Sequence, residues 1–221
     1  MGLVVNIESW PLSAAVAMAT EGIRAKYTTD AGGGGFGAAA KEIGAKLDGA
    51  KVLNTLDEML GCAPHLVHWS LFAYASPSWN NTKQKEKLID CVVSDWVAHQ
   101  FARGVCIQKR TYERVRSLVP FIAGGLAMEQ NSGVDTVFNS DGVTYSAVAP
   151  RGLLIEVLVQ EDCIKNDCTS ETYKKKRTRY YQSNWDRING HVDAIRDILI
   201  SYDKAAQILY TKTIDLIMMS N

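Results

Sequence analysis

The chain has 221 residues, enough for one or two domains that each bury a hydrophobic core. Its 24 basic and 24 acidic residues cancel, so a nucleic-acid role has to rest on local basic patches. The sequence has no apolar run near the roughly 20 residues of a membrane span and no signal-peptide pattern. These features predict a cytoplasmic protein without a membrane partner.

The N-terminal part predicts helices. Residues 9–27 suit one helix, with Ser9 as its cap and Pro11 in its first turn. A glycine run then leads into an Ala-rich helix, and a further helical stretch runs from Val52 to about Tyr74, interrupted near Gly61 and Pro64. The segment "SPSWNNTKQ" is typical of a linker. We therefore predict an N-terminal helical region over 1–80 and a second region over 81–221.

The second region begins with a helix that has an apolar stripe through Leu88, Val92 and Trp96. After a short loop around Gly104, another helix is expected from about Lys109 to Val119, with Pro120 ending it. Residues 134–159 are rich in β-branched side chains around an Asp-Gly turn signal, which predicts two or three strands in a β insertion over about 134–160. The expected fold class is mainly α, a helical bundle with a helix-turn-helix, a small β-hairpin or wing, and C-terminal helices.

The two helices around Gly104 have the form of a helix-turn-helix. In such a unit the second helix packs by its apolar face, while basic side chains on the opposite face contact phosphates and base edges. We expect Arg110 and Arg114 to face bases and Lys109 and Arg116 to lie nearer phosphates. A solvated helix whose Glu113 pairs with a neighbouring arginine would give the same pattern. The polar face comprises Lys109, Arg110, Glu113, Arg114, Arg116 and Ser117.

The densest positive charge in the chain lies between Tyr173 and Tyr181. Long cationic side chains suit phosphate contact, and each neutralised phosphate adds salt-dependent affinity. A solvated surface loop or a site for acidic protein partners are the alternatives. The predicted phosphate contacts are Lys174, Lys175, Lys176, Arg177 and Arg179.

The last helix carries a heptad-like apolar seam from Trp185 to Leu216, with steps of three and four residues. Packing inside one bundle accounts for such a seam, and a homodimer joined along it is the alternative. A dimerising protein-interaction module is therefore the competing functional class.

Three weaker patterns occur in the sequence. Gly32, Gly34 and Gly37 match the glycine spacing of dinucleotide-binding loops, but the sequence predicts no strand before them, so we expect a hinge. A nucleotide-binding enzyme that uses this glycine run is the third and weakest functional class. The group Cys62, His65 and His68 and the pair Cys163 and Cys168 lack the tight spacing of zinc ligands. No catalytic triad or carboxylate pair stands out. We expect no metal, no cofactor and no enzymatic activity.

Four short segments, taken in order, resemble the lambda-type Q antitermination proteins of bacteriophages. The first two are "GFGAAA" at 35–40 and "LFAYAS" at 71–76. The others are "TYERVRSLVP" at 111–120 and the stretch from "NWDRING" at 184 to "AAQIL" at 209. The resemblance covers about a third of the chain. It implies binding to a double-stranded DNA element near a promoter and loading onto bacterial RNA polymerase in the host cell. It also adds Arg187, in the Trp-x-Arg segment, to the predicted DNA-binding residues.

The chain departs from that family in one large respect. The family usually carries two C-x2-C pairs that form a zinc site, and this chain has none. The β-rich segment also separates parts that lie close together in the family. Either the helix-turn-helix keeps an inserted wing, or the matching segment is "TSETYKKKRTRYYQSNWDR" at 169–187. Both placements stay open from the sequence alone.

Overall fold

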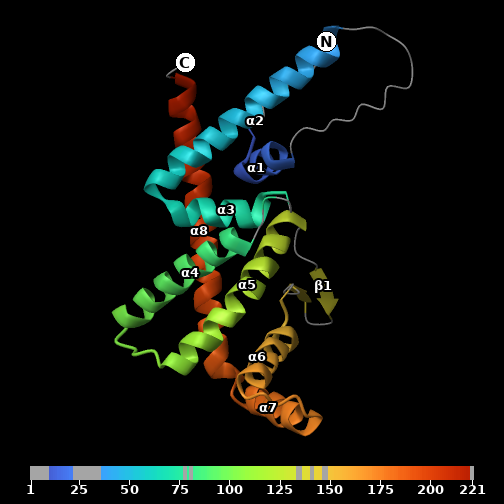
Figure 1. Cartoon of the computed structure of the whole chain (residues 1–221), viewed down its shortest axis with the longest axis vertical. Coiled ribbons are helices and arrows are strands. Elements are labelled where there is room, and N and C mark those ends of the chain that lie inside the picture. The colour runs from blue at the N-terminus through green and yellow to red at the C-terminus, as the bar shows by residue number, and fades with distance from the viewer. Residues whose placement is uncertain are drawn as a thin grey trace, which may run out of the picture. The chain divides into compact units, whose positions relative to one another are not determined.

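The protein is mainly α-helical, as the sequence predicted. The computed structural model describes residues 10–21, 36–76, 79, 82–132, 136–139, 142–145 and 149–219. Its described elements, labelled in Figure 1, are α1 (Leu12–Glu21), α2 (Phe36–Cys62), α3 (Pro64–Tyr74), α4 (Thr82–Ala102), α5 (Lys109–Ser132), β1 (Thr136–Asn139), β2 (Gly142–Tyr145), α6 (Arg151–Lys165), α7 (Glu171–Ser183) and α8 (Trp185–Met219). None of these helices is long and apolar enough to cross a membrane.

The chain forms two compact units. The first takes in residues 1–85 and 202–221, and the second takes in residues 86–201. Helices α4 and α8 each contribute residues to both units. The C-terminal part of α8 therefore belongs with the N-terminal helices, whereas the sequence analysis assigned it to the second region.

The first unit packs α1, α2 and α3 together with the end of α8. The interruption expected near Gly61 and Pro64 falls between α2 and α3, because α2 ends at Cys62 and Pro64 begins α3. Asp203 of α8 is 4% exposed and accepts hydrogen bonds from the Trp69 indole at 3.0 Å and from the Tyr74 hydroxyl. The acidic side chain thus fixes α8 against α3. The glycine pattern lies mostly outside the described residues, with only Gly37 inside α2.

The second unit is built on α4 and α5. The predicted stripe of α4 is buried, with Leu88, Val92 and Trp96 each at most 1% exposed. The connection between the helices passes Gly104, whose φ of +74° is a left-handed conformation that favours glycine. The Val105 amide closes this turn by donating to the Gln100 carbonyl at 3.0 Å. The short loop around Gly104 lies where the sequence predicted it.

Helix α5 does not end at Pro120, and the prediction of its C-terminus was wrong. Proline has no amide hydrogen to donate to the Arg116 carbonyl, which normally destabilises a helix interior. The apolar face nevertheless continues beyond it, with Val119, Ile122 and Leu126 each at most 2% exposed. Burial of this longer face outweighs the lost hydrogen bond, and the helix runs on to Ser132.

The predicted β insertion is shorter than the sequence indicated. Strands β1 and β2 pair antiparallel, with Asn139 opposite Gly142, next to the predicted Asp-Gly turn signal. Residues 151–160, expected to be β, instead form most of helix α6. Leu154, Ile155 and Leu158 are buried while Glu156 and Gln160 are exposed, which is a helical period. Packing against α5 and α7 overrides the β propensity of this segment.

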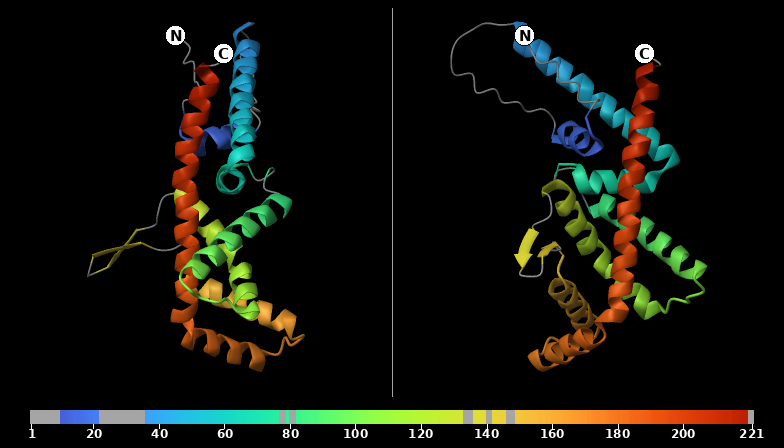
Figure 2. Two further views of the ribbon diagram at one scale, coloured as in Figure 1. Left: turned by 90° about the vertical axis from the view of Figure 1, so that its left-hand side faces the viewer. Right: turned by 180° about the vertical axis from the view of Figure 1, so that it is seen from behind.

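Helix α8 buries most of the predicted seam from Trp185 to Ala206, while Leu216 at its far end is 65% exposed. Trp185, Val192, Ile195, Leu199, Tyr202 and Ala206 are all at most 8% exposed. The helix passes through Gly190 without interruption. Figure 2 shows α7 leading directly into the first turn of α8, through Asn184. This connection brings the start of α8 beside α6 and α7 in the second unit.

Candidate nucleic-acid interface

The basic run from Tyr173 to Tyr181 lies in helix α7. Ser170 caps this helix, because its side chain accepts a hydrogen bond from the Tyr173 amide at 3.3 Å. Glu171 lies in the first turn, where a negative charge favours a helix, and it pairs with Lys174 at 2.9 Å. The helical period then separates the cations. Arg177 faces the unit, while Lys175, Lys176 and Arg179 are exposed.

Asp162 of α6 holds the inner face of α7 in place. Its carboxylate accepts hydrogen bonds from the Tyr181 hydroxyl at 2.6 Å and from Arg177 Nε at 2.7 Å. Arg114 of α5 lies 3.8 Å from the same carboxylate. The Asp162 side chain is 7% exposed, and those of Arg177 and Arg114 are 16% and 19% exposed. One buried anion thus joins three helices, α5, α6 and α7.

The ionisation of this cluster follows from its contacts. Burial on its own raises the pKa of Asp162. The hydrogen bonds from Tyr181 and Arg177 and the charges of Arg177 and Arg114 lower it by more than burial raises it, so the pKa lies below the ordinary value of 3.8. Burial, together with the hydrogen bond to Asp162, raises the pKa of Tyr181 to about 12. Asp162 is therefore an anion and Tyr181 a neutral donor at neutral pH.

Two tyrosines complete the cluster. The Arg177 guanidinium lies 4.5 Å from the centroid of the Tyr180 ring and 5.0 Å from that of Tyr181. The Arg114 guanidinium lies 5.3 Å from the Tyr181 centroid. Guanidinium groups are attracted to aromatic faces at such distances. Neither arginine extends freely into solvent, because both are held by an anion and by aromatic rings.

The predicted polar face of α5 is largely engaged within the protein. Arg116 pairs with Asp90 at 2.6 Å and with Glu86 at 3.0 Å, both on α4. Glu113 pairs with Lys165 of α6 at 3.1 Å, and the Ser117 hydroxyl donates to the Arg114 carbonyl at 2.8 Å. Arg116, Glu113 and Arg114 therefore fix α5 to α4 and α6, while the Ser117 hydrogen bond stays within α5. The helix presents its remaining predicted cations, Lys109 and Arg110, at its exposed first turn.

The exposed members of the predicted set lie at three places in the second unit. Lys175, Lys176 and Arg179 of α7, with Thr172, line a shallow hollow of about 320 Å³. Lys109 and Arg110 start α5, and Arg187 lies in the first turn of α8. Arg177, Arg114 and Arg116 are the members that the fold uses for internal ion pairs, and Lys174 pairs with Glu171 along α7.

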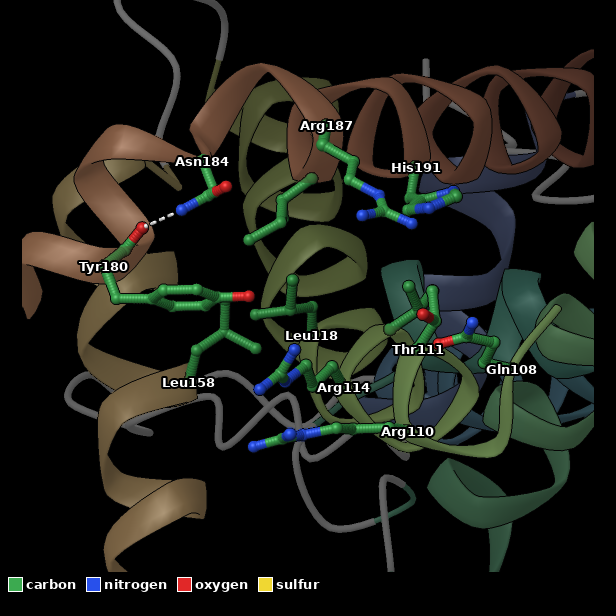
Figure 3. Close-up of a pocket in the computed structure, with 12 residues that line it drawn as sticks. Gln108, Arg110, Thr111, Arg114, Leu118, Leu158, Tyr180, Asn184, Arg187 and His191 are labelled. Carbon is green, nitrogen blue, oxygen red and sulfur yellow. Dashed lines mark hydrogen bonds between the residues drawn. The ribbon is translucent and has the colours of Figure 1, made fainter. Parts of the chain in front are cut away.

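A pocket of about 190 Å³ lies between α5, α6, α7 and α8 (Figure 3). Arg110 and Arg114 come from α5, and Arg187 and His191 come from α8, on the opposite wall. Burial, and secondly the charge of Arg187, lower the pKa of His191 below its ordinary 6.5. The His191 ring also packs perpendicular to the Trp96 ring, with 5.3 Å between centroids. His191 is therefore a neutral imidazole at neutral pH.

Sequence reasoning missed several residues of this region. Asp162 lies in a polar stretch that was not assigned to a helix, so its position opposite Arg177 and Arg114 was not apparent. Gln108, Asn184 and His191 line the pocket, but none of them belongs to a motif that the sequence predicted. Asn184 stands between two helices and donates to the Tyr180 carbonyl at 2.8 Å. Asparagine is common at the ends of helices, so the end of α7 at Asn184 is the one feature of this group that the sequence could have indicated.

Neither cysteine group forms a metal site among the described residues. No set of three or more histidine, cysteine, aspartate or glutamate side chains in that part of the chain is placed to hold a metal ion. Cys62 is exposed, Cys163 is buried and Cys168 is half-buried, each as a free thiol. The absence of a bound metal stays a prediction from the sequence.

Comparison of the chain with protein-family models, curated proteins and solved structures found no match. The geometry of the basic residues is therefore the main support for a functional proposal, with the sequence resemblance beside it.

Proposed function

We propose that the chain binds double-stranded DNA through the outer face of α7 and the first turn of α5. The main support for this proposal is that helix α7 has two different faces. Its inner face is fixed by Asp162, and its outer face presents Lys175, Lys176 and Arg179 to solvent. A rigid helix with clustered cations suits phosphate contact even in a chain whose net charge is zero.

The spacing of these cations suits a DNA strand. Lys175 and Arg179 are one helical turn apart, a rise of about 6 Å. Two nucleotide steps along one strand advance about 7 Å along the duplex axis. In this proposal the long side chains of Lys175, Lys176 and Arg179 contact phosphates within about two nucleotide steps of one strand. Phosphate contacts of this kind position a protein on DNA and carry no sequence information.

We assign base contact to the first turn of α5. In helix-turn-helix proteins the N-terminal residues of the second helix meet the base edges. With α4 and α5 in these roles, Lys109 and Arg110 are the exposed cations at that position. Arg114 and Arg116, which the sequence suggested for base and phosphate contact, take a structural role in this proposal because both are held in ion pairs. The β1–β2 hairpin takes the place of a wing.

The biological activity that we propose is transcription antitermination of the phage type. The support is the ordered resemblance to lambda-type Q proteins, whose Tyr-Arg segment falls on α5 and whose Trp-x-Arg segment begins α8. In this proposal the protein binds a DNA element near a promoter and then loads onto bacterial RNA polymerase. The DNA surface of α5 and α7 would serve the first step.

The competing proposal, a dimerising interaction module, has less support. Its seam was the apolar stripe of α8, and residues from Trp185 to Ala206 in that stripe pack within the chain. A second copy would have to use the last turns of the helix, where Leu216 is 65% exposed and Met219 is 85% exposed. Sedimentation of the purified chain at several concentrations tests this proposal directly.

The DNA proposal is tested with a fluorescently labelled duplex and three forms of the protein. The first is the wild type, and the second is Lys175→Gln with Lys176→Gln. The third is a matched control, Lys204→Gln with Lys212→Gln, which removes two exposed lysines from α8. We expect the α7 variant to bind at least about tenfold more weakly and the control to bind like the wild type. Equal weakening of both variants would mean that overall charge, and not α7, carries the binding.

The antitermination proposal needs a separate readout. Transcription by bacterial RNA polymerase is followed on a template with a promoter, a downstream terminator and the candidate element. We expect the wild-type chain to increase the read-through product and the α7 variant to lose that effect. If the wild type binds DNA but leaves read-through unchanged on a range of phage promoter templates, the protein has a different DNA-linked function.

A further inference from the structure

The pocket in Figure 3 is built from the beginnings of two long helices. Gln108 immediately precedes α5, and Arg110 and Thr111 lie in its first turn. Asn184 immediately precedes α8, and Arg187 lies in its first turn. Helix N-termini present amide hydrogens and the positive end of the helix dipole. Residues from two such ends line one recess.

The side chains of the pocket add charge of the same sign. Arg110, Arg114 and Arg187 all line it, and none of the described residues that line it carries a carboxylate. Asp162, which does not line the pocket, pairs with Arg177 and lies 3.8 Å from Arg114, so of the three pocket arginines it offsets the charge of Arg114 alone, and only in part. The buried Nε of Arg114 has no hydrogen-bond partner within the described part of the chain. The pocket therefore holds a surplus of about two positive charges and a donor without an acceptor.

The remaining walls restrict what can enter. Leu118, Leu158 and Ile188 are apolar, and the Tyr180 ring closes one side. A volume of about 190 Å³ accommodates a tetrahedral oxyanion and a few further atoms. Guanidinium groups bind phosphate oxygens in a two-point geometry, and the amide of Gln108 and the hydroxyl of Thr111 add neutral donors.

We propose that this pocket binds a terminal phosphate monoester. A monoester carries close to two negative charges at neutral pH, which matches the two guanidinium groups of Arg110 and Arg187. A phosphodiester of the nucleic-acid backbone carries only one negative charge. A terminal group can also enter a recess, while a duplex backbone meets the protein along a surface. The phosphate comes either from the 5′ end of a nucleic-acid strand or from a small phosphorylated molecule.

This site is separate from the phosphate-contacting face of α7. Its specific residues are Arg187 and Arg114, and Lys175 and Lys176 do not line it. Arg110 stands at the rim and is shared with the proposed base contact. The inference does not depend on the proposed function, because the pocket can hold a phosphate group whether or not α7 holds a duplex.

The test begins with inorganic phosphate as the probe. Its binding is measured by calorimetry at constant ionic strength, with chloride replaced by phosphate, for the wild type, Arg187→Gln and a control, Arg103→Gln. Arg103 is an exposed arginine on the turn before α5. We expect Arg187→Gln to weaken phosphate binding about tenfold or more and Arg103→Gln to leave it unchanged. No phosphate binding by the wild type, or equal losses in both variants, would overturn the proposal.

Two further arms identify the source of the group. Glycerol phosphate and a single-stranded oligonucleotide with a 5′ phosphate are each tested as competitors of inorganic phosphate. Glycerol and the same oligonucleotide without the phosphate are the controls. Competition by either phosphorylated compound alone supports the proposal and names the source. The variant Lys175→Gln with Lys176→Gln is expected to keep phosphate binding while it loses duplex binding. If Arg187→Gln loses duplex and phosphate binding in the same proportion, the pocket is part of the duplex surface and the monoester proposal fails.

Discussion

Replacing Asp162 with asparagine removes one negative charge from the buried cluster and keeps its shape. Arg177 and Arg114 would then share no anion, although their side chains are only 16% and 19% exposed. Breaking a buried ion pair typically costs 3–5 kcal/mol. Asparagine still accepts a hydrogen bond from Tyr181, so we expect a loss of about 2–4 kcal/mol in the free energy of unfolding.

The matched control is Asp90→Asn. The Asp90–Arg116 pair is short, at 2.6 Å, but the Asp90 side chain is 65% exposed and Arg116 has Glu86 as a second partner. Exposed ion pairs contribute 0–1 kcal/mol, so the same substitution should cost less than about 1 kcal/mol here. Comparing the two variants tests whether burial decides the cost, since distance alone would rank the two pairs as similar.

The assay is urea unfolding followed by circular dichroism, at neutral pH and at acid pH. The pKa of Asp162 is lowered in the folded chain, so its contribution is complete above the ordinary value of 3.8 and is lost as the pH falls through the folded pKa. The difference between wild type and Asp162→Asn should therefore shrink on acidification. Equal losses for Asp162→Asn and Asp90→Asn at neutral pH would refute the claim that this cluster fixes α7.

Three further outcomes follow from the structure. The pKa of His191 is lowered in the folded chain, so the unfolded chain binds a proton at this residue at a higher pH than the folded chain does. The free energy of unfolding should therefore fall as the pH drops below about 6.5. His191→Gln should make this dependence of the unfolding free energy on pH weaker. A Cβ at Gly125 would lie 2.8 Å from the Cβ of Ala149, so Gly125→Ala should cost about 1–3 kcal/mol. A Cβ at Gly124 would meet no described residue within 4 Å, so Gly124→Ala should gain up to about 1 kcal/mol. The opposite order in thermal unfolding would contradict the packing. Pro120→Ala restores an amide donor inside α5 and should raise the melting temperature; a lower one would show that the proline ring contributes more by packing than it costs.

Local patterns in the sequence were sufficient for much of the fold. The apolar stripe of α4, the turn at Gly104 and the break before Pro64 each depend on residues close together in the chain, and all three lie where they were expected. The end of α5 and the identity of α6 were predicted wrongly for one reason. In both segments a local preference, of proline at 120 and of β-branched residues at 155–159, gives way to the burial of a continuous apolar helix face.

The site was predictable in composition but not in arrangement. The basic residues of α5 and α7 were identified from the sequence, yet their exposure depends on partners that are distant in the chain. Arg114 meets Asp162, 48 positions later, and Arg116 meets Asp90, 26 positions earlier. A single sequence gives no sign of such pairings. For the same reason, the convergence of Arg110 with Arg187 at one pocket became visible only in the folded chain.

The salt dependence of duplex binding tests the central claim most directly. Each phosphate contact contributes about −0.9 to the slope of log affinity against log salt concentration. If the outer face of α7 contacts the DNA backbone, Lys175→Gln with Lys176→Gln should make the slope shallower by about 1.8, while Lys204→Gln with Lys212→Gln should leave it within about 0.5 of the wild type. An unchanged slope in the α7 variant, or the same change in both variants, would contradict the assignment of α7 as the DNA-binding face.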